Sequence, residues 1–240
     1  MRKPHLILIP GLLCDAAVWE DQAHELKHIA EITIADHGVL DSFPAMAESI
    51  LRQAPDRFAL AGHSMGGRVA FQIFRQAPER LTGLALLDTA YTPKRDGPEG
   101  EREAAERYGL LEKARSDGMR AMGREWLQRM VHPDRLLDRG LIDAILDMIA
   151  RKTPEIFSGQ IRALLERPDA TGLLSEIRCP TLVLCGRQDS WSVLEHHEKM
   201  ASMIPGSRLV VIEHCGHMST MERPAEVTAA LREWLTSLSV

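Results

Sequence analysis

The chain has little cysteine and no concentration of positive charge. Its 240 residues include four cysteines, and their spacing fits neither a paired zinc-ligand motif nor a disulfide framework. Lysine and arginine number 29 against 34 acids, the net charge is -5, and no basic tract occurs. The electrostatic footprint of a nucleic-acid-binding protein is therefore missing. We expect buried free thiols at Cys14, Cys179, Cys185 and Cys215, no nucleic-acid partner, and small-molecule chemistry.

A long apolar run is also missing near the start of the chain. The first apolar stretch, residues 6–9, is interrupted by Pro10 and Gly11, so it fits a first β-strand better than a secretory leader. We therefore expect a cytoplasmic protein with no membrane partner. At 45% hydrophobic residues, 240 residues suffice for one full core with a modest insertion.

Short apolar runs, many of them rich in β-branched residues, alternate with amphipathic segments along most of the chain. Near-continuous hydrophobicity in the short runs indicates strands covered on both faces, which is typical of a parallel sheet flanked by helices. The pattern predicts an α/β fold with about six mostly parallel strands. The expected strands are 5–9, 32–35, 58–61, 84–87, 181–185 and 208–212, and the expected helices are 18–29, 44–54, 65–77, 192–203 and 224–237.

The alternation stops between residues 91 and 171. Five short amphipathic helices are expected there, at 101–109, 111–117, 120–131, 135–150 and 154–166, with breaks at Gly109, Gly118, Pro133 and Pro154. An insertion after the fourth strand must begin at the carboxyl end of that strand, over the crevice where α/β sheets bind ligands. We therefore expect a core of residues 1–90 and 172–240 with a helical cap, or lid, of residues 91–171. An independent helical domain is the alternative.

The segment Gly62-His63-Ser64-Met65-Gly66-Gly67 joins an expected strand to an expected helix. A residue at such an abrupt turn adopts a strained backbone, and glycines two positions before and after it keep neighbouring atoms out of the way. The N-terminus of the helix also points at this residue, so its N–H groups can stabilise an oxyanion. Ser64 is therefore the candidate nucleophile.

A nucleophilic serine needs a base and an orienting acid at the same edge of the sheet. His217 follows the strand 208–212 and is the candidate base, with His214 as a weaker candidate closer to the strand. Asp189 follows the strand 181–185 and is the candidate acid, with Asp88 after the strand 84–87 as the competing one. The order serine, acid, histidine is typical of one hydrolase architecture and differs from that of the two familiar serine-protease folds.

Two further positions complete the expected site. The N–H of Met65 is one expected oxyanion donor, and the turn at Pro10 and Gly11 would point the N–H of Leu12 at the same oxygen. An ordinary Pro-Gly turn is the alternative. Trp191, two residues after Asp189, is a candidate wall of the substrate pocket, although it could equally pack under the lid.

Four ordered motifs, Pro10-Gly11-Leu12, Gly62–Gly67, Gly186–Asp189 and Cys215-Gly216-His217, together resemble the α/β-hydrolase family over essentially the whole chain. Within it, the small size, the helical insertion and the stretch from Met46–Ile50 to Pro78–Arg80 resemble bacterial carboxylesterases, including the pimeloyl-carrier-protein methyl ester esterases. The resemblance implies hydrolysis of a small-molecule ester through an acyl-enzyme, with no metal or cofactor. Thioester or lactone hydrolysis, carbon–carbon bond hydrolysis, perhydrolysis and lyase chemistry are alternatives within the fold. A triad-bearing ligand receptor with negligible turnover is the alternative outside catalysis.

Basic residues outnumber acids in part of the insertion. A basic face there could dock an acyl carrier that holds the substrate, although solvated helix faces also explain such a pattern. The basic residues are Lys113, Arg115, Arg120, Arg124, Arg129, Arg135 and Arg139, and the acids between them are Asp117, Glu125, Asp134 and Asp138.

Overall fold

The computed structural model describes residues 3–238 and contains a six-stranded sheet with all neighbouring pairs parallel. The strand order is β2-β1-β3-β4-β5-β6. Every residue of β3 and β5 is buried, whereas the edge strand β2 alternates between exposed and half-buried residues. The predicted parallel α/β sheet is confirmed. The strands are β1 (His5–Ile9), β2 (Glu31–Ile34), β3 (Phe58–His63), β4 (Leu81–Leu87), β5 (Thr181–Gly186) and β6 (Arg208–Ile212).

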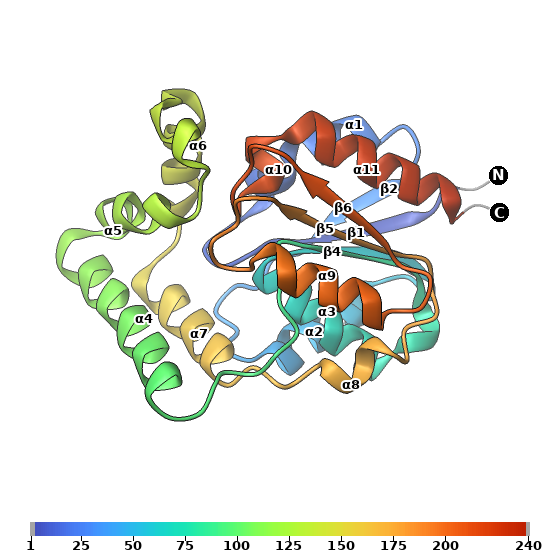
Figure 1. The fold of residues 1–240 in the computed structure, drawn as a ribbon, viewed down its shortest axis with the longest axis horizontal. Helices are drawn as coiled ribbons and strands as arrows, with labels where there is room; N and C mark the ends of the chain where they lie inside the picture. Colours follow the sequence, from blue (N-terminus) through green and yellow to red (C-terminus); the bar gives the residue numbers. More distant parts are fainter. Residues whose placement is uncertain (1–2, 239–240) are drawn as a thin grey trace.

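Helices cover both faces of the sheet (Figure 1). On one face lie α1 (Glu20–Leu26) and α11 (Pro224–Ser237), and on the other lie α2 (Phe43–Gln53), α3 (Met65–Gln76) and α9 (Leu194–Met203). Single turns form α8 (Thr171–Leu174) and α10 (Ser219–Glu222). Local sequence sets the helix starts: Ser42 caps α2 by accepting a hydrogen bond from the Ala45 N–H, and proline occupies the first turn of α2 and of α11.

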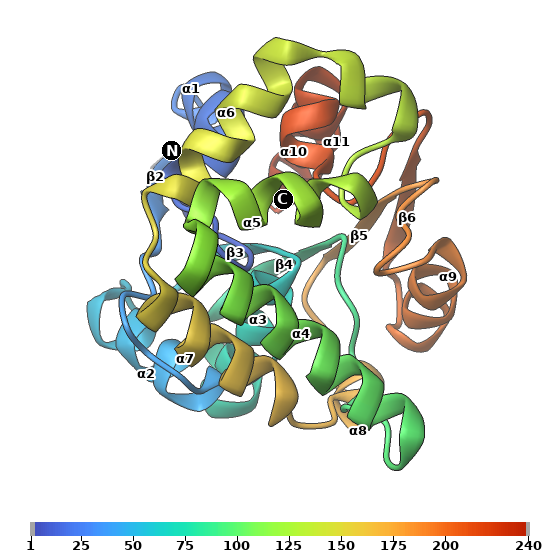
Figure 2. The ribbon, with the colours of Figure 1, turned by 90° about the vertical axis from the view of Figure 1, so that its left-hand side faces the viewer.

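Between β4 and β5 the chain forms a group of helices at the carboxyl ends of the strands, called the insertion below, as Figures 1 and 2 show. It contains α4 (Pro98–Asp117), α5 (Met119–Trp126), α6 (Arg139–Ala150) and α7 (Pro154–Leu165), with 3-10 turns at Leu127–Arg129 and Pro133–Leu137. In Figure 2, α4, α5 and α7 cross in front of the strand ends. The insertion is therefore placed over the edge where the candidate site residues follow the strands.

The expected helix break at Gly109 is wrong. Residue 109 lies inside α4, which continues to Asp117 and packs against α5 and α7. A glycine inside a helix costs about 1 kcal/mol relative to alanine, and packing between helices outweighs so small a propensity. The break at Gly118 does occur, with the glycine at φ +89°, and Asp138 begins α6 by capping the Leu141 N–H.

Among residues 3–238, no helix combines the length and the apolarity that crossing a bilayer requires.

Candidate active site

Ser64 occupies the junction between β3 and α3 with φ +54°, in the left-handed region that non-glycine residues rarely adopt. The turn is packed so closely that a Cβ atom at Gly62 would overlap the main chain of Gly66, and one at Gly66 would overlap the carbonyl of Ile9. The Thr89 hydroxyl donates a 2.7 Å hydrogen bond to the Ser64 carbonyl oxygen. These contacts hold the strained serine at the carboxyl end of β3.

Ser64, His217 and Asp189 lie in one hydrogen-bonded series. His217 Nε2 is 2.7 Å from Ser64 Oγ, and His217 Nδ1 is 2.7 Å from Asp189 Oδ2. The other carboxylate oxygen of Asp189 accepts hydrogen bonds from the N–H groups of Trp191 (2.8 Å) and Ser192 (2.9 Å). Because a carboxylate can only accept, the tautomer that satisfies this network carries its hydrogen on Nδ1. Nε2 is then free to accept the proton of the serine hydroxyl.

The histidine and the aspartate shift each other's pKa. Burial alone would raise the pKa of Asp189. The His217 charge and the hydrogen bonds to the carboxylate together lower it by more, so the net pKa lies below the usual value. Burial lowers the pKa of His217, but the negative charge and hydrogen bond of Asp189 raise it by more, so the net pKa lies above the usual value. The negative aspartate therefore stabilises the imidazolium that forms when His217 takes up a proton.

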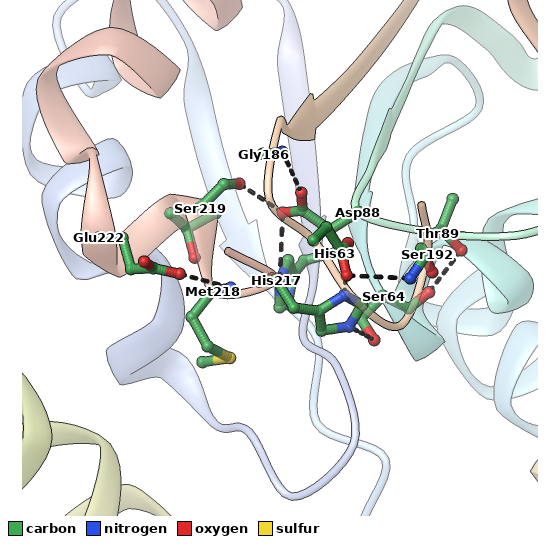
Figure 3. Close-up of polar contacts among 12 residues, drawn as sticks. His63, Ser64, Asp88, Thr89, Gly186, Ser192, His217, Met218, Ser219 and Glu222 are labelled. Carbon is green, nitrogen blue, oxygen red and sulfur yellow. Dashed lines mark hydrogen bonds and ion pairs between the residues drawn. The ribbon is translucent and has the colours of Figure 1, made fainter. Parts of the chain in front are cut away.

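Asp88, the competing acid, follows β4 at the same edge but has different partners (Figure 3). One of its oxygens accepts a 3.0 Å hydrogen bond from the Gly186 N–H, and the other contacts the Ser219 hydroxyl. Complete burial and the negative charge of Asp189 raise the pKa of Asp88 well above its usual value. The structure thus brings Asp189, and not Asp88, to the ring nitrogen of His217.

The main chain around His217 is held from three sides. The Nε2–H of His63 donates to the His217 carbonyl oxygen at 2.8 Å, and the His217 N–H donates to the Met130 carbonyl oxygen at 2.8 Å. The Glu222 carboxylate accepts the N–H groups of the residues before and after His217. Burial lowers the pKa of His63 to about 4, which keeps this ring neutral. His214, the weaker candidate base, is exposed, and its ring stacks edgewise on that of His132.

The two expected oxyanion donors line one cavity. Leu12 and Met65 both border the space next to Ser64. Met65 is the first residue of α3, so its N–H has no carbonyl acceptor within the helix. The loop of Leu12 is fixed from the insertion, because the buried Gln160 of α7 accepts a 2.9 Å hydrogen bond from the Leu13 N–H.

The cavity above Ser64 has a volume of about 270 Å³ and is bordered by both the core and the insertion. His217 lines it from the core, and Trp126 and Met130 line it from the insertion. The Trp191 ring lies in the wall, and the guanidinium groups of Arg107 and Arg129 lie over it, 5.6 and 5.5 Å from the ring centre. Trp191 thus borders the cavity and also packs against the insertion.

A sequence model of the alpha/beta hydrolase family matches residues 6–231 of the chain. The chain belongs to the alpha/beta hydrolase family. It is accordingly a hydrolase-type enzyme, as the motifs predicted.

Esterases are among the similar proteins. A pimeloyl-[acyl-carrier protein] methyl ester esterase of Nitrosomonas europaea is 25% identical over 242 residues, 93% of this chain and 92% of that protein. An enzyme of the same name from Neisseria meningitidis is 33% identical over 193 residues, 78% of this chain and 72% of that protein. The solved structure of a thermophilic esterase from Thermogutta terrifontis, with malate bound, has a TM-score of 0.86 at 32% identity, and covers 100% of this chain and 92% of that one.

Several contacts at the site of this α/β-hydrolase are not predicted by any sequence motif. Gln160 and the Met130 carbonyl oxygen reach the site from the insertion, and neither belongs to any of the four motifs. Arg68 also lines the cavity, and here a signal existed, since it stands four residues after Ser64 on the helix that the serine begins. In residues 3–238 no cluster of three or more His, Cys, Asp or Glu side chains is arranged to hold a metal ion.

Most of the basic residues noted in the insertion have acidic neighbours at its surface. Arg120 contacts both Asp143 and Asp147 of α6, and Lys113 forms a 3.0 Å ion pair with Glu125. Arg115, Arg129 and Arg135 each lie within 4 Å of a glutamate or an aspartate. The positive charge of this surface is therefore largely balanced within the insertion itself.

Proposed function

We propose that the chain is a serine carboxylesterase in which Ser64, His217 and Asp189 form a catalytic triad. The observation that carries the proposal is the continuous series of 2.7 Å contacts from the serine oxygen through the imidazole to the carboxylate, next to a cavity. The esterase relatives and the esterase of similar structure support the same chemistry. In this proposal residues 91–171 act as a cap that shapes the substrate cavity.

In the first half of the reaction, Ser64 Oγ attacks the ester carbonyl carbon while His217 Nε2 takes the serine proton. Asp189 stabilises the imidazolium that forms, in keeping with the raised pKa of His217. The N–H groups of Leu12 and Met65 stabilise the negative oxygen of the tetrahedral intermediate. His217 then gives the proton to the departing alkoxide oxygen, and an acyl-serine and a free alcohol result.

In the second half, a water molecule attacks the acyl-serine while His217 takes a proton from it. Collapse of the second tetrahedral intermediate breaks the bond to Ser64, and His217 returns the proton to the serine oxygen. The acid product leaves and the enzyme is restored. Each N–H donor to the oxyanion is worth about 3 kcal/mol of transition-state stabilisation.

The test replaces Ser64 by alanine. Hydrolysis of p-nitrophenyl acetate should fall by at least ~10⁴-fold, because the nucleophile is removed while the fold remains. Circular dichroism checks that the fold is unchanged. Retention of activity by S64A would refute the assignment. A wild-type protein that forms one trapped adduct without turnover would instead act as a ligand receptor.

A methyl ester attached to an acyl carrier is a second candidate substrate, because relatives with 25–33% identity are named for that activity. The balanced charge of the insertion surface gives little support to electrostatic docking of an acidic carrier. Comparing kcat/KM for one methyl ester as the carrier conjugate and as the free small molecule tests this candidate. A preference for the conjugate of tenfold or more supports it, and equal values contradict it.

A further inference from the structure

Four arginine side chains border the cavity above Ser64. Arg68 comes from α3, Arg107 from α4, Arg129 from the 3-10 turn after α5, and Arg167 from the chain after α7. Two carboxylates, those of Glu103 and Glu106, border the same space. A cavity next to a reactive serine therefore has an excess of positive charge, although the chain as a whole is negative.

The Glu103 carboxylate forms ion pairs with two of these arginines, Arg107 and Arg167. Glu103 accepts hydrogen bonds from Arg107 Nε at 3.0 Å and Nη2 at 2.8 Å, and from Arg167 Nη1 at 2.7 Å and Nη2 at 2.8 Å. Burial raises the pKa of Glu103, but the two guanidinium groups lower it to about 2, so the group is ionised at neutral pH. This cluster of three side chains keeps one uncompensated positive charge.

Arg68 has no carboxylate of its own. Its Nη1 donates a 2.9 Å hydrogen bond to the Thr92 carbonyl oxygen, and no acidic side chain of residues 3–238 lies within ion-pair distance. Burial and the positive charges of Arg167 and Arg107 lower the pKa of Arg68 to about 9. A half-buried cation beside other cations is unfavourable unless an anion joins it. Guanidinium forks match the two oxygens of a carboxylate.

We infer that the cavity selects esters that carry a carboxylate away from the scissile bond, with Arg68 and the neighbouring arginines binding that carboxylate. The inference rests on the proposed esterase function and names its substrate class. A volume of about 270 Å³ suits a small half-ester of a dicarboxylic acid. Four arginines against two glutamates leave two positive charges at the cavity, and the carboxylate of such a substrate compensates one of them.

The decisive measurement is the ratio of kcat/KM for monomethyl glutarate to kcat/KM for dimethyl glutarate. The two compounds share their acyl chain and their leaving alcohol and differ in one charge. We expect the wild-type ratio to exceed 1, and R68Q to lower it about tenfold, because a partly buried charge pair is worth that much in affinity. E103Q should change the ratio in the opposite direction, because it frees Arg107 and Arg167 for the substrate.

R75Q is the matched control. Arg75 lies on the same helix as Arg68, is exposed, and also donates to a main-chain carbonyl oxygen, that of Asp169 at 2.8 Å, but it does not line the cavity. The ratio of kcat/KM for the half-ester to that for the diester should be the same in R75Q as in the wild type. If Arg68 and Glu103 only fastened the insertion, both variants would slow the two esters equally and leave the ratio unchanged, which overturns the inference.

Inhibition of the wild type gives a test that needs no variant to fold. Glutarate should inhibit p-nitrophenyl acetate hydrolysis competitively, and more strongly than glutaramide or inorganic phosphate at equal concentration. Inhibition by phosphate alone would assign the arginines to a phosphate group and overturn the carboxylate assignment. Turnover of dimethyl glutarate with no preference for the half-ester overturns this inference and leaves the esterase function standing. No turnover of any ester overturns the proposed function itself.

Discussion

Replacing Asp189 by asparagine should reduce kcat on the order of 10³–10⁴-fold. In the structure the carboxylate lies 2.7 Å from His217 Nδ1, and both side chains are buried. With the two charge centres about 4 Å apart and an effective dielectric constant of about 20, the lost attraction is about 4 kcal/mol, or roughly a thousandfold in rate. The amide can also turn its NH₂ group to the ring, which favours the wrong tautomer and slows the reaction further.

The same substitution, D189N, should also shift the pH dependence of kcat/KM in a definite direction. His217 must be neutral to act as a base, so kcat/KM falls as the pH drops through its pKa, which in the wild type lies above the usual 6.5. Without the Asp189 charge this pKa falls, and the acidic limb of the profile moves to lower pH in D189N. Steady-state kinetics on p-nitrophenyl acetate between pH 5 and 9 measures both the loss of rate and the shift of the limb.

D88N is the matched control. An asparagine has nearly the same shape as the aspartate, and its amide oxygen can still accept from the Gly186 N–H. The Ser219 hydroxyl donates to Asp88 in the structure, and in D88N the amide NH₂ group would instead donate to the Ser219 oxygen. We expect its kcat to stay within about tenfold of the wild type, since the ring nitrogens of His217 are bonded to Ser64 and Asp189 and not to Asp88. A steep loss in D88N combined with a mild loss in D189N would refute the assignment of the acid.

Three further changes test other parts of the structure. Q160L should lower kcat about tenfold in steady-state assays, because the Leu13 N–H loses its acceptor and the oxyanion loop loosens; an unchanged kcat would show that the contact has no influence on the site. G66A should lower the free energy of unfolding by about 1–3 kcal/mol or more in a denaturant titration, because the new methyl group overlaps the Ile9 carbonyl; full stability would contradict the close packing of the turn. G109A should raise that free energy by up to about 1 kcal/mol, because the glycine lies inside α4 with open space where the methyl group would go; destabilisation would contradict this placement.

The sheet could be predicted because its causes are local. Continuous apolar runs locate buried strands, and the carboxyl ends of parallel strands share one edge, so Ser64, Asp189 and His217 could be expected to meet before any coordinates existed. The choice between Asp189 and Asp88 could not be decided in this way, because each follows a strand at that edge. Side-chain direction brings Asp189 to the His217 ring, and the local spacing of residues does not encode that direction.

The insertion shows where sequence reasoning ends. Its helical character follows from periodicity, but the helix boundary at Gly109 was missed because packing outweighed a small local preference. The contact between Gln160 and Leu13 joins residues 147 positions apart, and the contact from Met130 uses a main-chain carbonyl that every residue possesses. Such contacts depend on tertiary packing, and no residue type marks them in advance.

The insertion is bonded to two loops of the proposed site, and this has a consequence for exchanging it between related proteins. Gln160 holds the loop of Leu12, and Met130 holds the main chain of His217, so the segment that borders the cavity also positions groups of the proposed catalytic site. Transplanting this segment from a related protein would therefore change turnover along with selectivity.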